Sequence, residues 1–365
     1  MRADVLAWAQ SESTSKIISK ETLNHPALVE LVTGLDVFRD TPEAYRRAYA
    51  ALGIDVINRV PLRPAPASTP AGMTRAHPTK PYIYGHLGVY DTAMRHSYPC
   101  RTPEEVWDLD VEALRYDDLV TPVPHPVTRE DILKREAAIG NIGLYYPMLY
   151  TTLFMWGVEV LGWEIFLMAA ALDADRFHQT FLLPCVKKSR KLVTELARAS
   201  DSPFIFVHDD LADARGPLFR PDWYDTYVFP HYPEIFSGAK GCGKKIIFVA
   251  DGNMTAFLPQ LVDAGVDGLM FETPATPLEA VTEHFGQPGR YFIGGIATGI
   301  LTFGSPAEIR EMVLRLAVQA EDYPGFAMAS GGGLHDNIPM QNLTAYFDAR
   351  AEVGATPLDW RTRYR

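Results

Sequence analysis

Short apolar runs alternate with amphipathic runs from about residue 200 to the end of the chain. This alternation is typical of parallel strands joined by crossover helices. Five apolar runs predict strands, and they are Pro203–Asp210, Lys244–Asn253, Val266–Pro274, Arg290–Gly299 and Gly325–Pro339. Strand-then-helix units in succession predict a (β/α) barrel or a doubly wound sheet.

Two segments between these strands carry the same helix-start chemistry. Thr276–Glu279 (TPLE) and Ser305–Glu308 (SPAE) each offer an N-cap, a proline at the first helical position and a capping-box glutamate. The apolar residues after Ser305 recur with a period of 3.6, at Ile309, Met312, Val313, Leu316 and Ala320. We therefore predict that a helix begins at each of the two segments.

The first half of the chain has a less regular pattern. Pro42–Gly53 and Pro184–Ser200 predict helices, whereas Ile57–Pro66 and Lys80–Asp91 predict strands or extended segments. No fixed period repeats, and no long linker divides the chain. We expect one domain with an elaborated N-terminal third.

Composition and charge narrow the classes of partner. Hydrophobic residues make up 47% and charged residues 22%, which is typical of a globular protein. The net charge of -11 and the lack of clustered Lys and Arg argue against a nucleic-acid partner. The three cysteines have no zinc-knuckle or disulfide spacing, and we find no apolar segment typical of a signal peptide or membrane span. We expect a soluble cytoplasmic protein without a membrane partner.

Polar residues follow four of the predicted strands at the same structural position. They are His208, Asp209 and Asp210, then Asp251 and Asn253, then Glu272, and finally His335 to Asn337. In a parallel barrel the carboxyl ends of the strands surround one cavity, so these residues are candidates for catalysis or substrate binding. His208, Asp251, Glu272 and His335 would also form a mixed nitrogen and oxygen ligand set for zinc or another divalent ion.

Each candidate also has an ordinary structural interpretation. Asp251 before Gly252 fits a turn, and Asn337 fits an N-cap. Asp209 and Asp210 would serve equally well as helix caps or as ion-pair partners of Arg215. Tyr146 and the other aromatic residues of Gly143–Gly157 would form either a substrate wall or core packing. Two or three residues of Tyr82–Pro99 could reach the same cavity, among them Tyr84, His86, Asp91, Arg95 and His96.

Three long segments resemble the uroporphyrinogen decarboxylase superfamily, most of all its corrinoid-linked methyltransferase-like branch. They are HDDLADARGPLFRPDWYDTYVFPHYPEIF, GKKIIFVADGNMTAFLPQLVDAGVDGLMF and HDNIPMQNLTAYFDA, with a fainter match at GIDVINRVPL. The resemblance implies an α/β fold with a single (β/α)8 TIM-type barrel and an elaborated N-terminal segment. We accordingly divide the chain into a helical extension (1–60), the barrel (61–352) and a C-terminal tail (353–365).

The motifs also depart from those of the family. VINRVPLRP stands where the haem-pathway decarboxylases carry an arginine-rich motif that holds substrate carboxylates. Val249 and Asp251 occupy the positions of the zinc-binding His-x-Cys pair of the thiol-activating methyltransferases, and no cysteine follows Cys242. Asp251 therefore takes the place of the metal-ligating cysteine, and the DGN motif resembles the corrinoid-linked demethylating members.

The resemblance leads to a main hypothesis and two alternatives. The first is a methyltransferase that moves a methyl group from a small methylated substrate to a corrinoid protein or tetrahydrofolate. Its catalytic candidates are Asp251, His208, Asp210, Glu272 and His335. Its substrate-binding candidates are Asp209, Tyr146, Arg215, Asn253 and Asn337. The second is a decarboxylase of a small or porphyrinogen-like polycarboxylate, in which Arg59 or Arg215 would bind carboxylates. The third is a non-catalytic ligand-binding barrel. Zinc is an expected cofactor of the first, and a homodimer is expected from the family.

Overall fold

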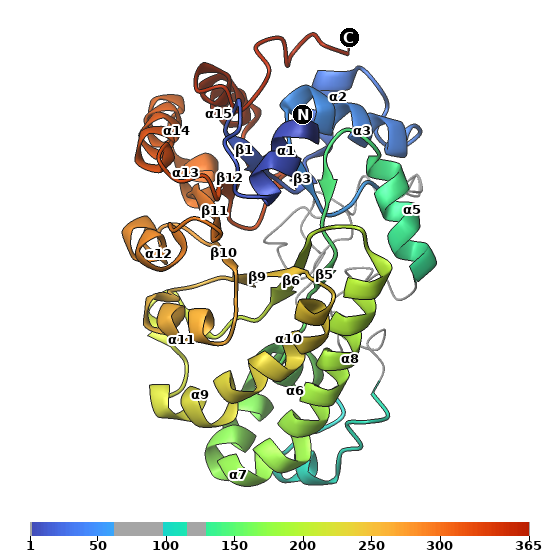
Figure 1. The fold of residues 1–365 in the computed structure, drawn as a ribbon, viewed down its shortest axis with the longest axis vertical. Coiled ribbons are helices and arrows are strands. Elements are labelled where there is room, and N and C mark those ends of the chain that lie inside the picture. Colours follow the sequence, from blue (N-terminus) through green and yellow to red (C-terminus); the bar gives the residue numbers. More distant parts are fainter. Residues whose placement is uncertain (1, 62–97, 115–128, 365) are drawn as a thin grey trace. The chain divides into compact units, whose positions relative to one another are not determined.

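The computed structural model describes residues 2–61, 98–114 and 129–364 (Figure 1). The chain forms two compact units. Unit 1 comprises residues 1–91, 133–146 and 270–365, and unit 2 comprises residues 92–132 and 147–269. Each unit is described by itself below. The candidate residues of Tyr82–Pro99 up to His96, and the extended segment Lys80–Asp91, lie outside the described residues.

A parallel sheet supplies the strands of both units. In the described part of the chain it has nine strands, in the order β4-β3-β1-β12-β11-β10-β9-β6-β5. Those of unit 1 are β1 (Ile18–Lys20), β3 (Val56–Ile57), β4 (Leu144–Tyr145), β11 (Tyr291–Ile296) and β12 (Phe326–Ser330). Those of unit 2 are β5 (Met148–Leu149), β6 (Phe204–His208) and β9 (Lys245–Ala250), while β10 (Gly268–Phe271) crosses the boundary after Leu269.

The strands of unit 2 are buried on both faces. All five residues of β6 are buried, and so are Ile246 to Ala250 of β9. Burial of both faces explains why these runs are continuously apolar rather than alternating. The pairs Phe204 with Lys245 and His208 with Val249 bring the carboxyl ends of β6 and β9 together.

Helices cover the strands of unit 2. They are α6 (Phe154–Leu172), α7 (Ala174–Phe177), α8 (Leu183–Ala199), α9 (Pro221–Tyr227), α10 (Tyr232–Gly241) and α11 (Leu258–Asp263). Short helical turns connect them, namely η1 (Glu104–Asp108), η3 (His178–Leu182), η4 (Phe229–His231) and η5 (Thr255–Phe257). Helix α8 precedes β6 and helix α10 precedes β9, and the two helices pack side by side (Figure 1). A two-stranded hairpin, β7 (Ala212–Asp213) with β8 (Gly216–Pro217), follows β6.

Unit 1 has its own helices. They are α1 (Arg2–Ala9), α2 (Pro26–Thr33), α3 (Thr41–Leu52), most of α5 (Arg129–Ile139), α12 (Leu278–Phe285), α13 (Thr298–Phe303), α14 (Pro306–Ala320) and α15 (Met340–Glu352). Two-residue strands β2 (Leu23–Asn24) and β13 (Leu334–His335) pair in parallel beside the main sheet. The segment predicted as a helical extension thus contributes β1 and β3 to the sheet, as well as helices.

The α/β fold of the TIM-barrel type is confirmed. Each of the five runs predicted as strands contains a strand, and the helices predicted at Pro42–Gly53 and Pro184–Ser200 are α3 and α8. The capping box at Ser305 is present, with the Glu308 amide 3.3 Å from the Ser305 hydroxyl and the Ser305 amide 2.7 Å from the Glu308 carboxylate. A helix does begin within Thr276–Glu279, since α12 starts at Leu278, but its N-cap is Pro277 rather than Thr276 and no side-chain cap forms. Thr276 is buried, and its amide donates to the Glu272 carbonyl instead.

Helix α6 is long and apolar enough to cross a membrane by length and composition. Half of its most apolar window is buried inside the structure, which is typical of a core helix of a soluble protein. Gly162 has non-helical angles (φ 76°, ψ 159°), so the helix is interrupted there. Buried Glu159 and exposed Glu164 place acidic side chains in the same helix, which is unfavourable in hydrocarbon.

Candidate active site at the ends of β6 and β9

A polar cluster forms where β6 and β9 end in unit 2. His208 is the last residue of β6, and its Nε2 lies 3.2 Å from Oδ1 of Asp210. The same Oδ1 accepts a hydrogen bond of 2.9 Å from the backbone amide of Asp251, the first residue after β9. Asp210 therefore joins the two strand ends, and three of the predicted catalytic residues lie together.

His208 is held from both of its ring nitrogens. Nδ1 lies 2.7 Å from the carbonyl oxygen of Tyr150, and the imidazole stacks on the Tyr150 ring with centroids 4.4 Å apart. Both acceptors are oxygens, so the ring donates from both nitrogens and carries a positive charge. Only 5% of His208 is exposed.

The charge of this imidazolium depends on its carboxylate neighbours. Burial lowers the pKa of His208, but the Asp210 and Asp251 carboxylates outweigh it and raise that pKa to about 9. Conversely, burial raises the pKa of Asp210, but the imidazolium outweighs it and lowers that pKa below its usual value. The His208 imidazolium thus lies beside the carboxylates of Asp210 and Asp251.

Asp251 is the exposed member of the cluster. Gly252, the next residue, has φ +77°, and a Cβ there would lie 2.4 Å from the Ala212 carbonyl oxygen. A glycine is required at this close approach, which brings the loop after β9 against the hairpin after β6. The backbone amide of Asn253 donates to the Asp213 carbonyl at 2.8 Å, and the side-chain Oδ1 of Asn253 accepts from the Thr255 amide at 3.1 Å. Asn253 therefore fixes the loop and binds the first amide of η5.

Asp209 has a structural role, which corrects its prediction as a substrate-binding residue. Its side chain is fully buried and accepts hydrogen bonds from the amides of Leu153, Phe154 and Met155 and from the Tyr232 hydroxyl, all between 2.7 and 3.0 Å. Burial raises the pKa of Asp209 to about 6, although these four donors favour the ionised form. Asp209 thus anchors the N-terminus of α6, where the orphan amides of a helix need acceptors.

Arg215 lies in the turn of the β7–β8 hairpin. Its guanidinium donates to Oδ2 of Asp213, at 3.1 Å from Nε and 2.7 Å from the terminal nitrogen. Asp213 also accepts the backbone amide of Arg215 at 2.8 Å. The ion-pair partner of Arg215 is thus Asp213, and not Asp209 or Asp210 as the sequence suggested.

The remaining candidates belong to unit 1. Glu272 is the half-buried residue after β10, and a Cβ added to Gly331 would lie 2.9 Å from its Cγ. His335 is buried in β13, and burial together with His25 lowers its pKa. Asn337 is exposed and precedes α15, whose N-cap is Pro339 rather than Asn337. Tyr146 is buried, and desolvation raises its pKa far above the usual value for a phenol; it therefore packs as a core residue.

The residues of the proposed zinc set are divided between the two units, with His208 and Asp251 in one and Glu272 and His335 in the other. Within the described residues, no group of three or more His, Cys, Asp or Glu side chains is arranged to hold a metal ion. Both nitrogens of His208 donate hydrogen bonds, so this ring has no lone pair for a metal. The arrangement does not fit zinc, and no chemical step below depends on it.

Tyr150 is the functional residue that the sequence did not single out. The sequence placed it only among aromatic residues of a substrate wall or of the core, although its carbonyl and ring hold His208. The two residues are 58 positions apart, so no local spacing signals their contact. For Asp209, the sequence offered one signal of its structural role. Successive side chains of an extended segment point to opposite sides, so Asp209 should point away from His208 and Asp210.

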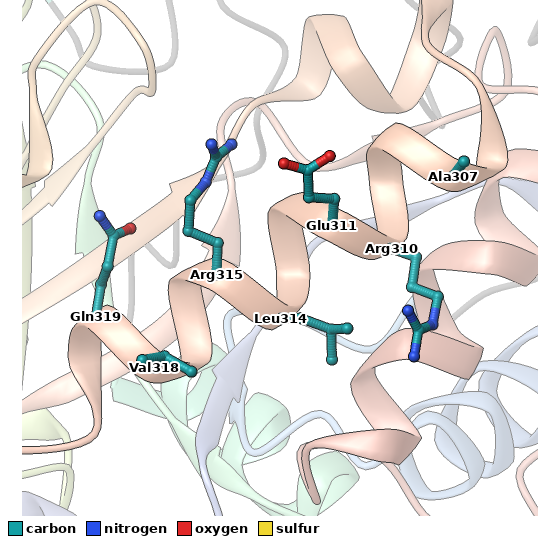
Figure 2. Close-up of a pocket in the computed structure, with 7 residues that line it drawn as sticks. All are labelled: Ala307, Arg310, Glu311, Leu314, Arg315, Val318 and Gln319. Carbon is teal, nitrogen blue, oxygen red and sulfur yellow. The ribbon is translucent and has the colours of Figure 1, made fainter.

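An open pocket of ≈ 510 Å³ lies elsewhere, along the surface of α14 in unit 1. Figure 2 shows the side chains that line it, all from this one helix: Ala307, Arg310, Glu311, Leu314, Arg315, Val318 and Gln319. It contains none of the residues predicted for catalysis or binding. We therefore place the candidate active site at the polar cluster of unit 2.

Comparisons with known proteins agree with the motifs. Residues 196–353, which contain the whole polar cluster, match the family model for uroporphyrinogen decarboxylase (URO-D). The chain is 23% identical over 241 residues to a uroporphyrinogen decarboxylase of Carboxydothermus hydrogenoformans, an alignment that spans 64% of this chain and 65% of that protein. The fold is similar to a methyltransferase from Methanosarcina mazei, with a TM-score of 0.61 and 16% identity over 96% of this chain and 98% of the other. The resemblance to the uroporphyrinogen decarboxylase superfamily is confirmed.

Proposed function

Because this chain is related to the uroporphyrinogen decarboxylase superfamily, we propose that it is a methyltransferase that takes a methyl group from a small methylated substrate. The acceptor would be a corrinoid protein or tetrahydrofolate. The observation that carries the proposal is the cluster of exposed Asp251, half-buried Asp210 and buried His208 at the ends of β6 and β9. The fold similarity to a methyltransferase is consistent with it.

The charge of the cluster favours a cationic methyl donor. Asp251 places an exposed carboxylate at the end of β9, beside the His208–Asp210 pair. A methylated ammonium group would be attracted to it, and a carboxylate-bearing substrate would be repelled. We therefore propose a methylated amine, protonated or quaternary, as the substrate class.

A cationic donor also resolves the problem of the leaving group. When the acceptor's electron pair forms the new bond to the methyl carbon, the carbon–nitrogen pair stays on nitrogen, and the amine leaves neutral. A methyl ether would instead need a proton for its departing oxygen, and both protons of His208 are committed to Tyr150 and Asp210. The geometry therefore favours amines over ethers.

The three residues of the cluster have distinct roles in this proposal. Asp251 would contact the ammonium group. Asp210 positions Asp251 through the backbone amide of that residue, and His208 holds Asp210 ionised. If tetrahydrofolate is the acceptor, its attacking nitrogen must lose a proton, and the Asp251 carboxylate is the nearest exposed base of the cluster.

The proposal is tested with a panel of donors and two acceptors. Trimethylamine, tetramethylammonium, methyl phenyl ether and methylated thiols would be incubated with the protein and either reduced cobalamin or tetrahydrofolate, and the methylated acceptor would be measured by mass spectrometry. We expect transfer from an ammonium donor and none from the ether. The Asp251→Ala variant should lose about 10²-fold or more of the rate, while Asp213→Ala, in the neighbouring hairpin, should stay within about threefold of the wild type.

The alternatives are tested in two parallel assays, with polycarboxylates as substrates and with thermal denaturation in the presence of ligands. Release of CO2 from a polycarboxylate without methyl transfer would identify a decarboxylase, which the name of the curated relative and half-buried Arg59 favour. Saturable thermal stabilisation by a ligand without any turnover would identify a binding barrel.

The partners and location follow from the same family relationship. We propose a cytoplasmic homodimer that meets a corrinoid protein as methyl acceptor. Light scattering on the purified protein would give its oligomeric state, and a monomer at micromolar concentration would contradict that part of the proposal.

A further inference from the structure

Two histidines meet in unit 2 outside the cluster of the proposed active site. His178 begins the turn η3, and His231 ends the turn η4. Their Nε2 atoms lie 2.7 Å apart, and their ring centroids lie 4.9 Å apart with a tilt of 32°. Helices α7 and α9, which precede these turns, lie well away from strands β6 and β9 in Figure 1.

The short contact determines the protonation of the pair. Two nitrogens at 2.7 Å repel each other unless one is N–H and the other offers its lone pair. The two Nε2 atoms therefore share one hydrogen, and imidazole nitrogen is a ligand that suits zinc and nickel.

The geometry of the pair is close to that of two ligands on one metal ion. Zinc binds imidazole nitrogen at about 2.0–2.1 Å, so two such nitrogens in a tetrahedral site lie about 3.3 Å apart. The observed separation needs to widen by less than about 1 Å, which small side-chain rotations provide. Both rings are half-buried, so water could complete the coordination.

The backbone around His178 supports a binding role. Residues His178–Leu182 form a π-helical turn between α7 and α8, and such turns are rare and frequent at functional sites. The Tyr227 hydroxyl donates to Asp175 at 2.7 Å, and the Tyr227 ring lies 5.3 Å from that of His178. These contacts fix the segment that presents His178 opposite His231.

We propose that His178 and His231 bind one divalent transition-metal ion, with zinc or nickel as the class that imidazole ligands prefer. The ion would replace the shared hydrogen, which would move to Nδ1 of its own ring so that both imidazoles stay neutral. The ion would join the segment before α8 to the segment before α10. Magnesium and calcium, which prefer oxygen ligands, would not bind here. The site would be structural, since it lies outside the polar cluster of the proposed reaction.

Calorimetric titration of the purified chain with ZnCl2 at pH 7.5 tests this site. We expect one equivalent of zinc that is lost, or weakened by at least about tenfold, in both His178→Ala and His231→Ala. The control variants His284→Ala, on α12 of unit 1, and Asp251→Ala, in the polar cluster, should keep it. Loss in Asp251→Ala with retention in the two histidine variants would instead place the metal at the active site and overturn the proposal.

A second measurement uses the wild-type chain and does not depend on the folding of any variant. Modification of histidines by diethyl pyrocarbonate, mapped by peptide mass spectrometry, should be suppressed by zinc at His178 and His231 and not at His284. Equal modification of the pair with and without zinc, or a wild-type chain that binds no zinc, would mean that the two rings share only a hydrogen bond. Neither experiment depends on the proposed methyl transfer.

Discussion

At the scale of single residues, adjacent positions of the chain have different roles, one in the polar cluster and the other in the buried core. His208 and Asp210 form the polar cluster with Asp251, whereas Asp209 between them is buried under the N-terminus of α6. Successive side chains of an extended segment point to opposite sides, so His208 and Asp210 share one side and Asp209 takes the other.

The raised pKa of His208 makes folding stability depend on pH. A histidine whose folded pKa lies above its unfolded value of 6.5 contributes stability that is full below pH 6.5 and is lost as pH rises through about 9. For this buried ring the contribution is about 3 kcal/mol. Urea denaturation at pH 6, 7.5 and 9 should show a larger decline in the free energy of unfolding for the wild type than for His208→Gln. Parallel curves for the two proteins would contradict the charged state of His208.

At the scale of elements, α14 shows how far local chemistry alone fixes a helix start. The Ser305 hydroxyl accepts from the Glu308 amide, and the Glu308 carboxylate accepts from the Ser305 amide. The similar TPLE segment also starts a helix, since α12 begins at Leu278, but it does so without a side-chain cap. The Thr276 amide donates to the Glu272 carbonyl, so it is not bound by the Glu279 carboxylate as in a capping box.

Removal of the capping box should weaken unit 1 measurably. Ser305→Ala deletes one acceptor at the N-terminus of α14, and we expect it to lower the free energy of unfolding by about 1 kcal/mol. Ser237→Ala in α10 is a matched control, since that exposed hydroxyl donates to the Glu234 carbonyl within its own helix. The control should change stability by less than about 0.5 kcal/mol in urea denaturation. Equal effects of the two substitutions would show that the box has no energetic role.

At the scale of the whole molecule, a buried network joins distant parts of the chain within unit 1. The Glu21 carboxylate after β1 accepts from the Ser330 amide at 3.1 Å and from the Tyr346 hydroxyl at 2.6 Å. Arg350 of α15 lies 3.5 Å from Glu21 and donates to the Thr356 hydroxyl. Glu21 and Arg350 are both fully buried, so each requires the other.

The residues predicted as a C-terminal tail take part in this packing. Trp360 is 1% exposed and packs on Phe347 with ring centroids 5.5 Å apart, and Thr356 also donates to the Leu52 carbonyl at 3.0 Å. A chain ending at Glu352 should lose at least about 3 kcal/mol of stability, because it exposes the surface under Trp360 and strips Arg350 of two partners. A chain ending at Trp360 is the control and should melt within a few degrees of the full chain. Equal melting temperatures for all three would show that the segment is dispensable.

The sequence alone determined the elements and the polar residues at their ends. A continuous apolar run such as Ile246 to Val249 indicates a strand that is buried on both faces, and the run can be recognised in the sequence without knowledge of the fold. The family motifs around His208, Asp210 and Asp251 likewise lie within short segments, and the structure brings these three residues together.

The tertiary structure alone decided the partner of each polar group. Asp209 meets the amides of residues 153 to 155, and His178 meets His231 across 53 positions. Such contacts depend on how a loop of many residues closes, and hydrophobic periodicity carries no information on that closure. For this reason the sequence located the candidate site, while only the fold separated its reactive groups from those that support them.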